Sequence, residues 1–272
     1  MQVGVFAKTF PGNEPAGVLA AVRDAGFAVT QFNLACAGLP SMPDSVPDEA
    51  IRSIDAAAKA SGVRLVALSG TYNMAHPDRR VRDEGLCQLA VVIETAAKLS
   101  IPLVTLCTGT RNAEDQWAHH PDNADPSAWA DMASEMEKAL RLAERHGVDL
   151  GIEPEQANIV TSAGDAVRLI GEMGSTRLRI VLDPANLFER ASAGEARAIV
   201  AEAVERAAGH IALAHAKDRF ADGRFATAGQ GIVDFADFIA RLKAAGFDGP
   251  LVTHGLSAGD APGVARFLKE LV

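Results

Sequence analysis

The chain has 272 residues, of which 48% are hydrophobic and 22% charged, a composition typical of a globular protein with a substantial core. Its formal net charge of −9 argues against the broad positive face that nucleic-acid binding requires, so we expect no nucleic-acid partner. The three cysteines form no paired motif, and no apolar run approaches the roughly 18 residues that span a bilayer, so we expect a cytoplasmic protein that does not contact a membrane.

Short runs rich in aliphatic and β-branched residues alternate with longer stretches rich in alanine and charge. In chain order, the runs that we expect to form strands are 3–10, 28–34, 64–69, 103–108, 148–153, 178–183, 211–217 and 251–254. The stretches that we expect to form helices are 15–25, 48–60, 79–99, 129–145, 164–173, 193–207, 235–245 and 262–271. Eight such alternations predict a single (β/α)8 TIM barrel, an α/β fold that spans residues 1–272 as one domain. An open doubly wound sheet is the alternative, but it would normally contain fewer strands.

Glycine follows several of the expected helices, directly before the next strand. Gly26, Gly62, Gly147 and Gly246 occupy such positions. A residue just past a helix end often takes the left-handed conformation that a Cβ penalises, so these glycines are predicted to cap helix C-termini. The longest irregular segment, 109–127, is predicted to form a lid or loop on the rim of the barrel.

Polar side chains end every expected strand, and the C-terminal ends of barrel strands meet at the face where chemistry takes place. Glu153, Asp183, His215 and His254 end the last four strands. Two carboxylates and two imidazoles at one face form a site suited to Mn²⁺, Co²⁺, Zn²⁺ or Fe²⁺. We therefore predict a divalent metal site made of these four residues.

Six segments around these strand ends resemble the xylose isomerase-like TIM barrel superfamily, in its branch of sugar phosphate isomerases and epimerases. They are SGTYNMAHPD at 69–78, GIEPE at 151–155, VLDPAN at 181–186, HAKD at 215–218, GQGIVDF at 229–235 and VTH at 252–254. The resemblance covers nearly the whole chain. It implies that Glu153, Asp183 and His215 are metal ligands, with Mn²⁺ favoured and Mg²⁺ added to the candidate cations.

One ligand position departs from the family's pattern. Epimerases and isomerases of the family usually carry a glutamate at the end of the eighth strand, where this chain has His254. In the family's mechanism, Glu153 and that glutamate exchange a proton with opposite faces of one carbon. Asn186 likewise stands where the family often has a histidine. An imidazole binds metals and acts as a base near neutral pH, but it is not equivalent to a carboxylate.

The resemblance implies a metal-dependent isomerase or epimerase that removes a proton next to the carbonyl of a keto-sugar, phosphorylated or not. Glu153 is expected to act as ligand and base, and Lys217 or His254 to handle the second proton. The residues expected to orient the sugar hydroxyls are Lys8, Asn33, Thr108, Arg111 and Asn186. A small sugar is therefore the expected partner, and self-association into a homo-oligomer is common in the family.

Two other functions are compatible with the sequence. A lyase or dehydratase acting on a keto-sugar, keto-inositol or 3-keto-glycoside needs one base and one acid, which suits His254. A barrel that binds sugar without catalysis is the other alternative. The endonuclease branch of the fold is not expected, because it needs a basic groove and further ligands on the early strands. The turn from Gly229 to Gly231 follows the seventh strand, where barrels often bind phosphate through backbone N–H groups.

Overall fold

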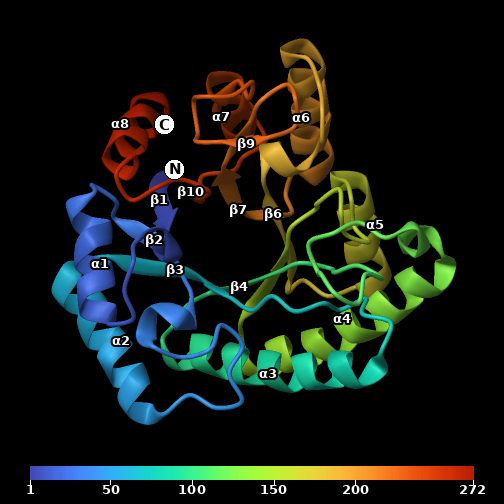
Figure 1. The fold of residues 1–272 in the computed structure, drawn as a ribbon, viewed down its shortest axis with the longest axis horizontal. Helices are drawn as coiled ribbons and strands as arrows, with labels where there is room; N and C mark the ends of the chain where they lie inside the picture. Colours follow the sequence, from blue (N-terminus) through green and yellow to red (C-terminus); the bar gives the residue numbers. More distant parts are fainter.

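Eight parallel strands close into a barrel in the computed structural model, which describes residues 1–272 (Figure 1). Their order around the barrel is β1-β10-β7-β6-β5-β4-β3-β2. They are β1 (Gln2–Phe6), β2 (Val29–Phe32), β3 (Arg64–Ser69), β4 (Leu103–Leu106), β5 (Asp149–Ile152), β6 (Leu178–Leu182), β7 (Ile211–Ala216) and β10 (Pro250–Thr253). The closed parallel sheet confirms the predicted (β/α)8 TIM barrel.

Eight α-helices form a ring outside the strands (Figure 1). They are α1 (Pro15–Asp24), α2 (Asp48–Ser61), α3 (Arg79–Lys98), α4 (Pro126–His146), α5 (Ala163–Met173), α6 (Ala193–Ala207), α7 (Phe235–Ala244) and α8 (Ala261–Leu271). No helix combines the length and the apolar character that crossing a membrane requires. The N-terminal strand and the C-terminal helix lie next to each other, so the chain closes on itself.

The predicted elements are found at their expected places, with small shifts at their ends. β3 and α6 match the predicted ranges, whereas β1 ends at Phe6 because the next residues form a short 3-10 turn, Ala7–Thr9. α4 begins three residues before the predicted start, because Asp125 caps it and Pro126 occupies its first position. The last two residues of the predicted rim loop 109–127, Pro126 and Ser127, therefore belong to α4.

The glycines predicted to cap helices take the left-handed conformation. Their φ angles are 95° at Gly26, 70° at Gly62, 69° at Gly147 and 79° at Gly246. Gly62 and Gly147 are the C-cap residues of α2 and α4, and their N–H groups donate to helix carbonyls. The left-handed conformation is confirmed at all four positions, where a side chain would strain the backbone. The C-cap position is confirmed for Gly62 and Gly147, whereas Gly26 and Gly246 lie one residue beyond the C-caps Ala25 and Ala245.

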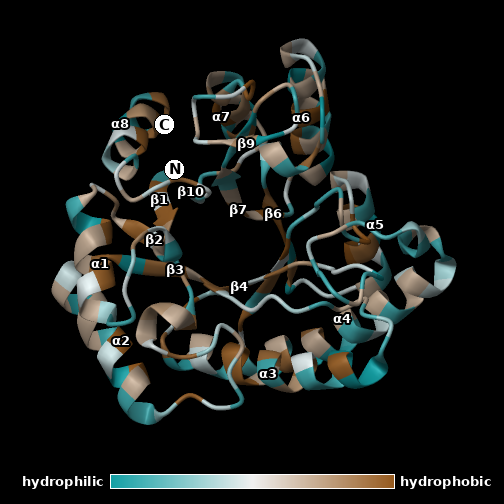
Figure 2. Ribbon diagram, in the orientation of Figure 1, coloured by the Kyte–Doolittle hydropathy of each residue, from teal (hydrophilic) through white to brown (hydrophobic).

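Alternation of side chains along the strands separates two apolar regions. Ile180 and Leu251 belong to a large core between the barrel and its helices. Their neighbours Val181 and Val252 belong to a separate small cluster on the other face of the strands. Figure 2 shows brown on the strands and both colours on the surrounding helices. We call the small group, which fills the barrel interior, the inner cluster; its buried members are Val29, Val66, Ala67, Leu103, Val181, Leu213 and Val252.

A short antiparallel hairpin that the sequence analysis did not predict follows β7. Its strands are β8 (Asp218–Arg219) and β9 (Phe225–Ala226). Each of them has two residues, which is too short for a recognisable hydrophobic pattern. The hairpin lies directly after the end of β7 and so stands at the mouth of the barrel.

The packing of α3 depends on a glycine. Gly85 faces the buried ring of Tyr72, and a Cβ on Gly85 would lie 2.2 Å from Tyr72 Cδ2. Gly171 in α5 has no heavy atom within 4 Å of the place where its Cβ would be. Both glycines lie in helices, but a Cβ would clash at Gly85 and would meet open space at Gly171.

We expect Gly85→Ala to lower the free energy of unfolding by about 1–3 kcal/mol, because the buried tyrosine ring must shift. Gly171→Ala is expected to raise it by about 0.4–1 kcal/mol, because alanine loses less entropy than glycine in a helix. Urea unfolding followed by circular dichroism measures both values. A stabilising Gly85→Ala substitution would contradict this packing.

Candidate metal centre

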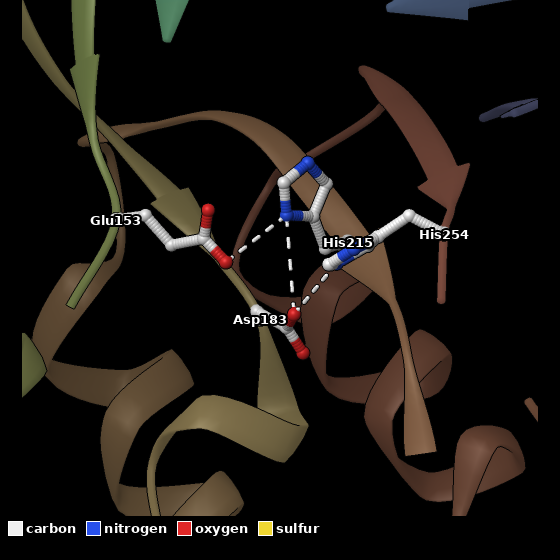
Figure 3. Close-up of side chains that lie close together, drawn as sticks. All are labelled: Glu153, Asp183, His215 and His254. Atoms are coloured by element: carbon white, nitrogen blue, oxygen red, sulfur yellow. Dashed lines mark hydrogen bonds and ion pairs between the residues drawn. The ribbon is translucent and has the colours of Figure 1, made fainter. Parts of the chain in front are cut away.

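Four side chains converge at the C-terminal mouth of the barrel (Figure 3). Glu153, Asp183 and His254 each follow the last residue of their strand, and His215 lies within β7. One ligand atom from each residue lies within 4.8 Å of the others. Because β5, β6, β7 and β10 are neighbours in the barrel, the structure brings together all four residues predicted to bind a metal.

The alternation of the strands aims these side chains into the barrel. Asp183 lies two residues after Val181 of the inner cluster. The same spacing separates His254 from Val252. Residues two apart on a strand share a face, so the site forms a polar layer directly above the apolar interior. Local sequence thus decides which side chains face one another.

Short contacts link the four groups to one another. His215 Nδ1 is 3.2 Å from Glu153 Oε1 and 3.9 Å from Asp183 Oδ2. His254 Nε2 is 2.9 Å from the same Asp183 oxygen. The other oxygen, Asp183 Oδ1, accepts a hydrogen bond from the Ala185 N–H at 2.9 Å. Asp183 therefore caps the turn after β6 with one oxygen and presents the other to the site.

Gln31 of β2 holds His215 from the opposite side. Its side-chain Nε2 donates to the hydroxyls of Ser69 and Thr105, both at 3.1 Å, so its Oε1 faces His215 Nε2 at 2.9 Å. In this arrangement His215 Nε2 carries the hydrogen and donates it to Gln31. The lone pair of a neutral His215 then lies at Nδ1, facing the carboxylate of Glu153. A neutral His215 therefore presents Nδ1 as a ligand atom beside a carboxylate oxygen, as a metal site requires.

The electrostatics of the site suit such a cation. Burial alone would raise the pKa of Asp183, but the Lys217 ammonium and the His254 contact outweigh it and hold that pKa well below the usual range. Burial and the neighbouring His215 lower the pKa of His254, which favours the neutral imidazole that binds metals. Two anionic carboxylates and two imidazoles therefore fit a divalent cation such as Mn²⁺, Co²⁺, Zn²⁺ or Fe²⁺.

Lys217 and Asn186 form a hydrogen-bonded pair beside these four residues. Lys217 Nζ donates to Asn186 Oδ1 at 2.6 Å and lies 3.4 Å from Asp183 Oδ2. Asn186 Nδ2 donates to Glu153 Oε1 at 2.7 Å. The ammonium of Lys217 is buried and lies 4.1 Å from the centre of the Phe225 ring on the hairpin. Both residues therefore lie beside the four candidate ligands.

A cavity of about 580 Å³ opens above this site, which we call the metal cavity. Of the predicted site residues, those that line it are Lys8, Asn33, Glu153, Asn186, His215, Lys217 and His254. No role was predicted from the sequence for the other polar residues on its wall, which are Gln31, Ser41, Ser69, Thr71, Thr105, Gln116 and Glu155. Burial, and then the negative charge of Glu153, raise the pKa of Glu155 to about 7.

Thr108 and Arg111, predicted to orient sugar hydroxyls, do not line the metal cavity. The Thr108 hydroxyl is fully buried and accepts a hydrogen bond from the Val160 N–H at 3.0 Å. The Arg111 guanidinium is 2.8 Å from the Asp131 carboxylate. The chain turns after β4 at Gly109, whose φ angle is 76°, and Arg111 beyond this turn contacts Asp131 of α4.

The turn from Gly229 to Gly231 does not offer free N–H groups to a phosphate. The buried carboxylate of Asp218 accepts hydrogen bonds from Gly229 at 3.0 Å, from Gly231 at 2.8 Å and from Val233 at 3.0 Å. A Cβ on Gly231 would lie 2.3 Å from Asp218 Oδ1. The turn is therefore wrapped around a carboxylate of the chain itself, which corrects the expectation of an anion site.

Gln31 should control metal affinity without touching the metal. We expect Gln31→Leu to weaken Mn²⁺ binding by about 10–100-fold, because His215 loses the partner that orients its ring. Isothermal titration calorimetry on chelator-treated protein measures the dissociation constant. The control is Gln2→Leu at the start of β1, where the glutamine bonds to Arg64. Equal affinities in the two variants would contradict this role for Gln31.

The chain is similar to several solved structures over nearly its full length. It matches the 3-keto-D-glucoside 4-epimerase of E. coli over 99% of both chains, with 18% identity and a TM-score of 0.78. It matches the D-psicose 3-epimerase of Clostridium cellulolyticum H10 over 100% of this chain and 99% of that one, with 16% identity and a TM-score of 0.75. For the D-allulose 3-epimerase of Methylomonas sp. the shares are 100% and 97%, with 17% identity and a TM-score of 0.78. At these identities the likeness shows a shared fold.

No protein among those with curated descriptions matches the sequence. A family model does match, over residues 19–271, and it describes a xylose isomerase-like TIM barrel. This match covers most of the chain and confirms the resemblance carried by the strand-end motifs. The chain therefore belongs to the xylose isomerase-like TIM barrel family.

Proposed function

We propose that this protein is a metal-dependent isomerase or epimerase that acts on an unphosphorylated keto-sugar. The observation that carries the proposal is the convergence of two carboxylates and two imidazoles at the floor of a polar cavity, with Lys217 and Asn186 beside them. The similar solved structures are described as sugar epimerases, which supports an enzyme that acts on sugars.

Glu153 is the residue that we assign to proton removal. A divalent cation held by Glu153, Asp183, His215 and His254 would polarise the carbonyl of a keto-sugar and make the adjacent C–H more acidic. The Glu153 side chain lines the cavity; Asn186 Nδ2 donates to its Oε1 at 2.7 Å, and His215 Nδ1 lies 3.2 Å from the same oxygen. We favour Mn²⁺, because manganese accepts both carboxylate and imidazole ligands.

Lys217 is the group that we assign to the returning proton. Its ammonium lines the metal cavity and is held beside Asp183 and Asn186. A buried ammonium stabilises negative charge that develops on a substrate oxygen, and it can donate a proton in the same place. The contact of His254 Nε2 with Asp183 supports a ligand role for His254 in preference to that of a second base.

The contacts around the metal cavity favour a substrate without phosphate. The N–H groups of Gly229 and Gly231 are bonded to Asp218. A phosphate in the cavity would also meet the carboxyl groups of Glu153 and Glu155 on its wall. The Lys8 ammonium and the Asn33 side-chain amide N–H groups line the cavity and offer hydrogen-bond donors to neutral hydroxyls.

A lyase on a keto-sugar is the second candidate. It would begin with the same proton removal and end with the loss of a substituent from the next carbon. None of the similar structures reported above is described as a lyase. The products therefore decide between the two reactions.

Turnover in D₂O tests the proposed chemistry. Protein treated with a chelator and reloaded with Mn²⁺ is incubated with ketoses, keto-inositols and 3-keto-glycosides, and the products are examined by mass spectrometry and NMR. We expect an isomer of the substrate that carries deuterium at the exchanged carbon, formed by the reloaded protein and not by the chelated one. An isomer without deuterium would contradict proton removal, and a product that has lost water or an aglycone would establish the lyase.

Substitution of the base provides a second test. Glu153→Gln should lower kcat by about 10²–10⁴-fold, because the carboxylate that removes the proton is lost. Metal content measured on the same sample shows whether the loss of activity follows loss of the cation. Glu144→Gln, at an exposed position in α4, is the control and should leave kcat unchanged. A Glu153→Gln variant with the original kcat would rule out this base.

A further inference from the structure

A second cavity adjoins the metal cavity and has nearly the same size. Its volume is about 640 Å³, and it is lined by α3, by the segment after β3 and by the segment 113–117. Thr71, Gln116 and Trp117 line both cavities, so they form a shared wall. We call this second space the outer cavity. Small-molecule sites usually occupy about 300–1,000 Å³, and here two spaces of that size adjoin.

Trp117 stands between the two cavities with an unusually exposed ring. It is 52% exposed, although it lies in a loop held by its own hydrogen bonds. Asn112 Oδ1 accepts from the N–H groups of Glu114 and Asp115, both at 3.0 Å, and Asp115 Oδ1 accepts from the Trp117 N–H at 2.9 Å. The loop thus presents the indole to the cavities instead of burying it in the core.

Phe225 presents a second exposed ring in the metal cavity. It is 51% exposed, and its ring lies 4.1 Å from both Lys217 Nζ and Arg219 Cζ. Large aromatic rings bury apolar area when a ligand covers them, and tryptophan also offers a polar N–H at its edge. Rings at the borders of a polar cavity suit the flat C–H faces of sugar rings.

The charges of the outer cavity limit what it can hold. Its acidic and histidine lining residues are His76, Glu84, Glu114 and Asp115. No lysine or arginine lines it, so an anionic group would meet repulsion without a compensating cation. Met42, Val81 and Trp117 supply apolar surface on the same wall. These properties favour an uncharged occupant with both apolar and hydroxyl-bearing surface.

We propose that the substrate is a neutral keto-glycoside that spans both cavities. The keto-sugar ring occupies the metal cavity, and a second sugar ring, joined through the glycosidic oxygen, lies in the outer cavity against Trp117. The placement of the first ring rests on the proposed function. The second ring rests on the shared wall, the exposed indole and the absence of cationic lining residues.

Binding of unreactive sugars tests the outer cavity without any turnover. Trp129→Phe leaves Trp117 as the one tryptophan, and Trp129 itself lies elsewhere, bonded to Glu172 at 2.8 Å. In this variant we expect methyl cellobioside to change the Trp117 emission and to bind at least about tenfold more tightly than methyl glucoside, because the second ring covers the indole. Equal affinities, or no change in emission, would overturn the proposal.

Filling the outer cavity tests its part in substrate choice. Val81 on α3 is 41% exposed and lines the outer cavity but not the metal cavity. Ile199 on α6 is 36% exposed and lines neither cavity. We expect Val81→Trp to lower the ratio of kcat/KM for 3-keto-cellobioside to kcat/KM for methyl 3-keto-glucoside by at least about tenfold. Ile199→Trp should leave that ratio unchanged.

The outcomes separate this inference from the proposed function. Deuterium exchange on the single-ring substrate with an unaltered ratio in Val81→Trp would overturn the two-ring substrate and keep the isomerase or epimerase. A Trp117 response to the two-ring sugar with no deuterium exchange on any substrate would overturn the isomerase or epimerase. It would keep the outer cavity as a binding site for glycosides.

Discussion

The rest of the site is arranged around the buried carboxylate of Asp183. A carboxylate that loses its hydration must gain partners, because an unpaired buried charge is very unfavourable. Asp183 gains them from several elements: the turn after β6 at one oxygen, and His215, Lys217 and His254 at the other. These residues belong to β7 and to the segments after β7 and β10. The carboxylate is therefore satisfied only when β6, β7 and β10 close in their observed order.

The residue at the end of the eighth strand sets the number of carboxylates at the site. With His254 in that place, Glu153 and Asp183 are the carboxylates of the four-residue cluster, and their charges match those of one divalent cation. The positive charge of Lys217 then has no further anion among these four residues. A substrate oxygen that becomes negative during the reaction would supply that missing charge, which agrees with Lys217 as its partner.

Much of the fold and the four candidate ligands could be predicted, because each depends on local pattern. A strand period of two decides which side chains face inward, and Asp183 and His254 end strands whose preceding inward residues are apolar. The same rule would have found Gln31, which lies two residues after Val29 of the inner cluster. Gln31 stands one residue before the end of β2, so a prediction based on the residues at the strand ends does not include it.

Contacts that depend on the path of a long loop could not be predicted in this way. Arg111 contacts Asp131 through the path of the loop after β4, and no spacing in the sequence reveals that path. The partners of Asp218 could not be predicted either. Its hydrogen bonds with the N–H groups of Gly229 and Gly231 depend on a loop that returns to the end of β7.

The wrapped carboxylate of Asp218 also affects its neighbour in the chain. Bonds from four backbone N–H groups, those of Arg219, Gly229, Gly231 and Val233, hold the backbone at the end of β7 in one conformation. Lys217 begins from that fixed point, and its long side chain is confined by Asn186 and Phe225. A free lysine loses rotamer entropy when it binds a ligand, a cost of up to about 2 kcal/mol. Here the folding of the chain has already ordered the ammonium, so a sugar that reaches it meets a donor whose direction is set in advance.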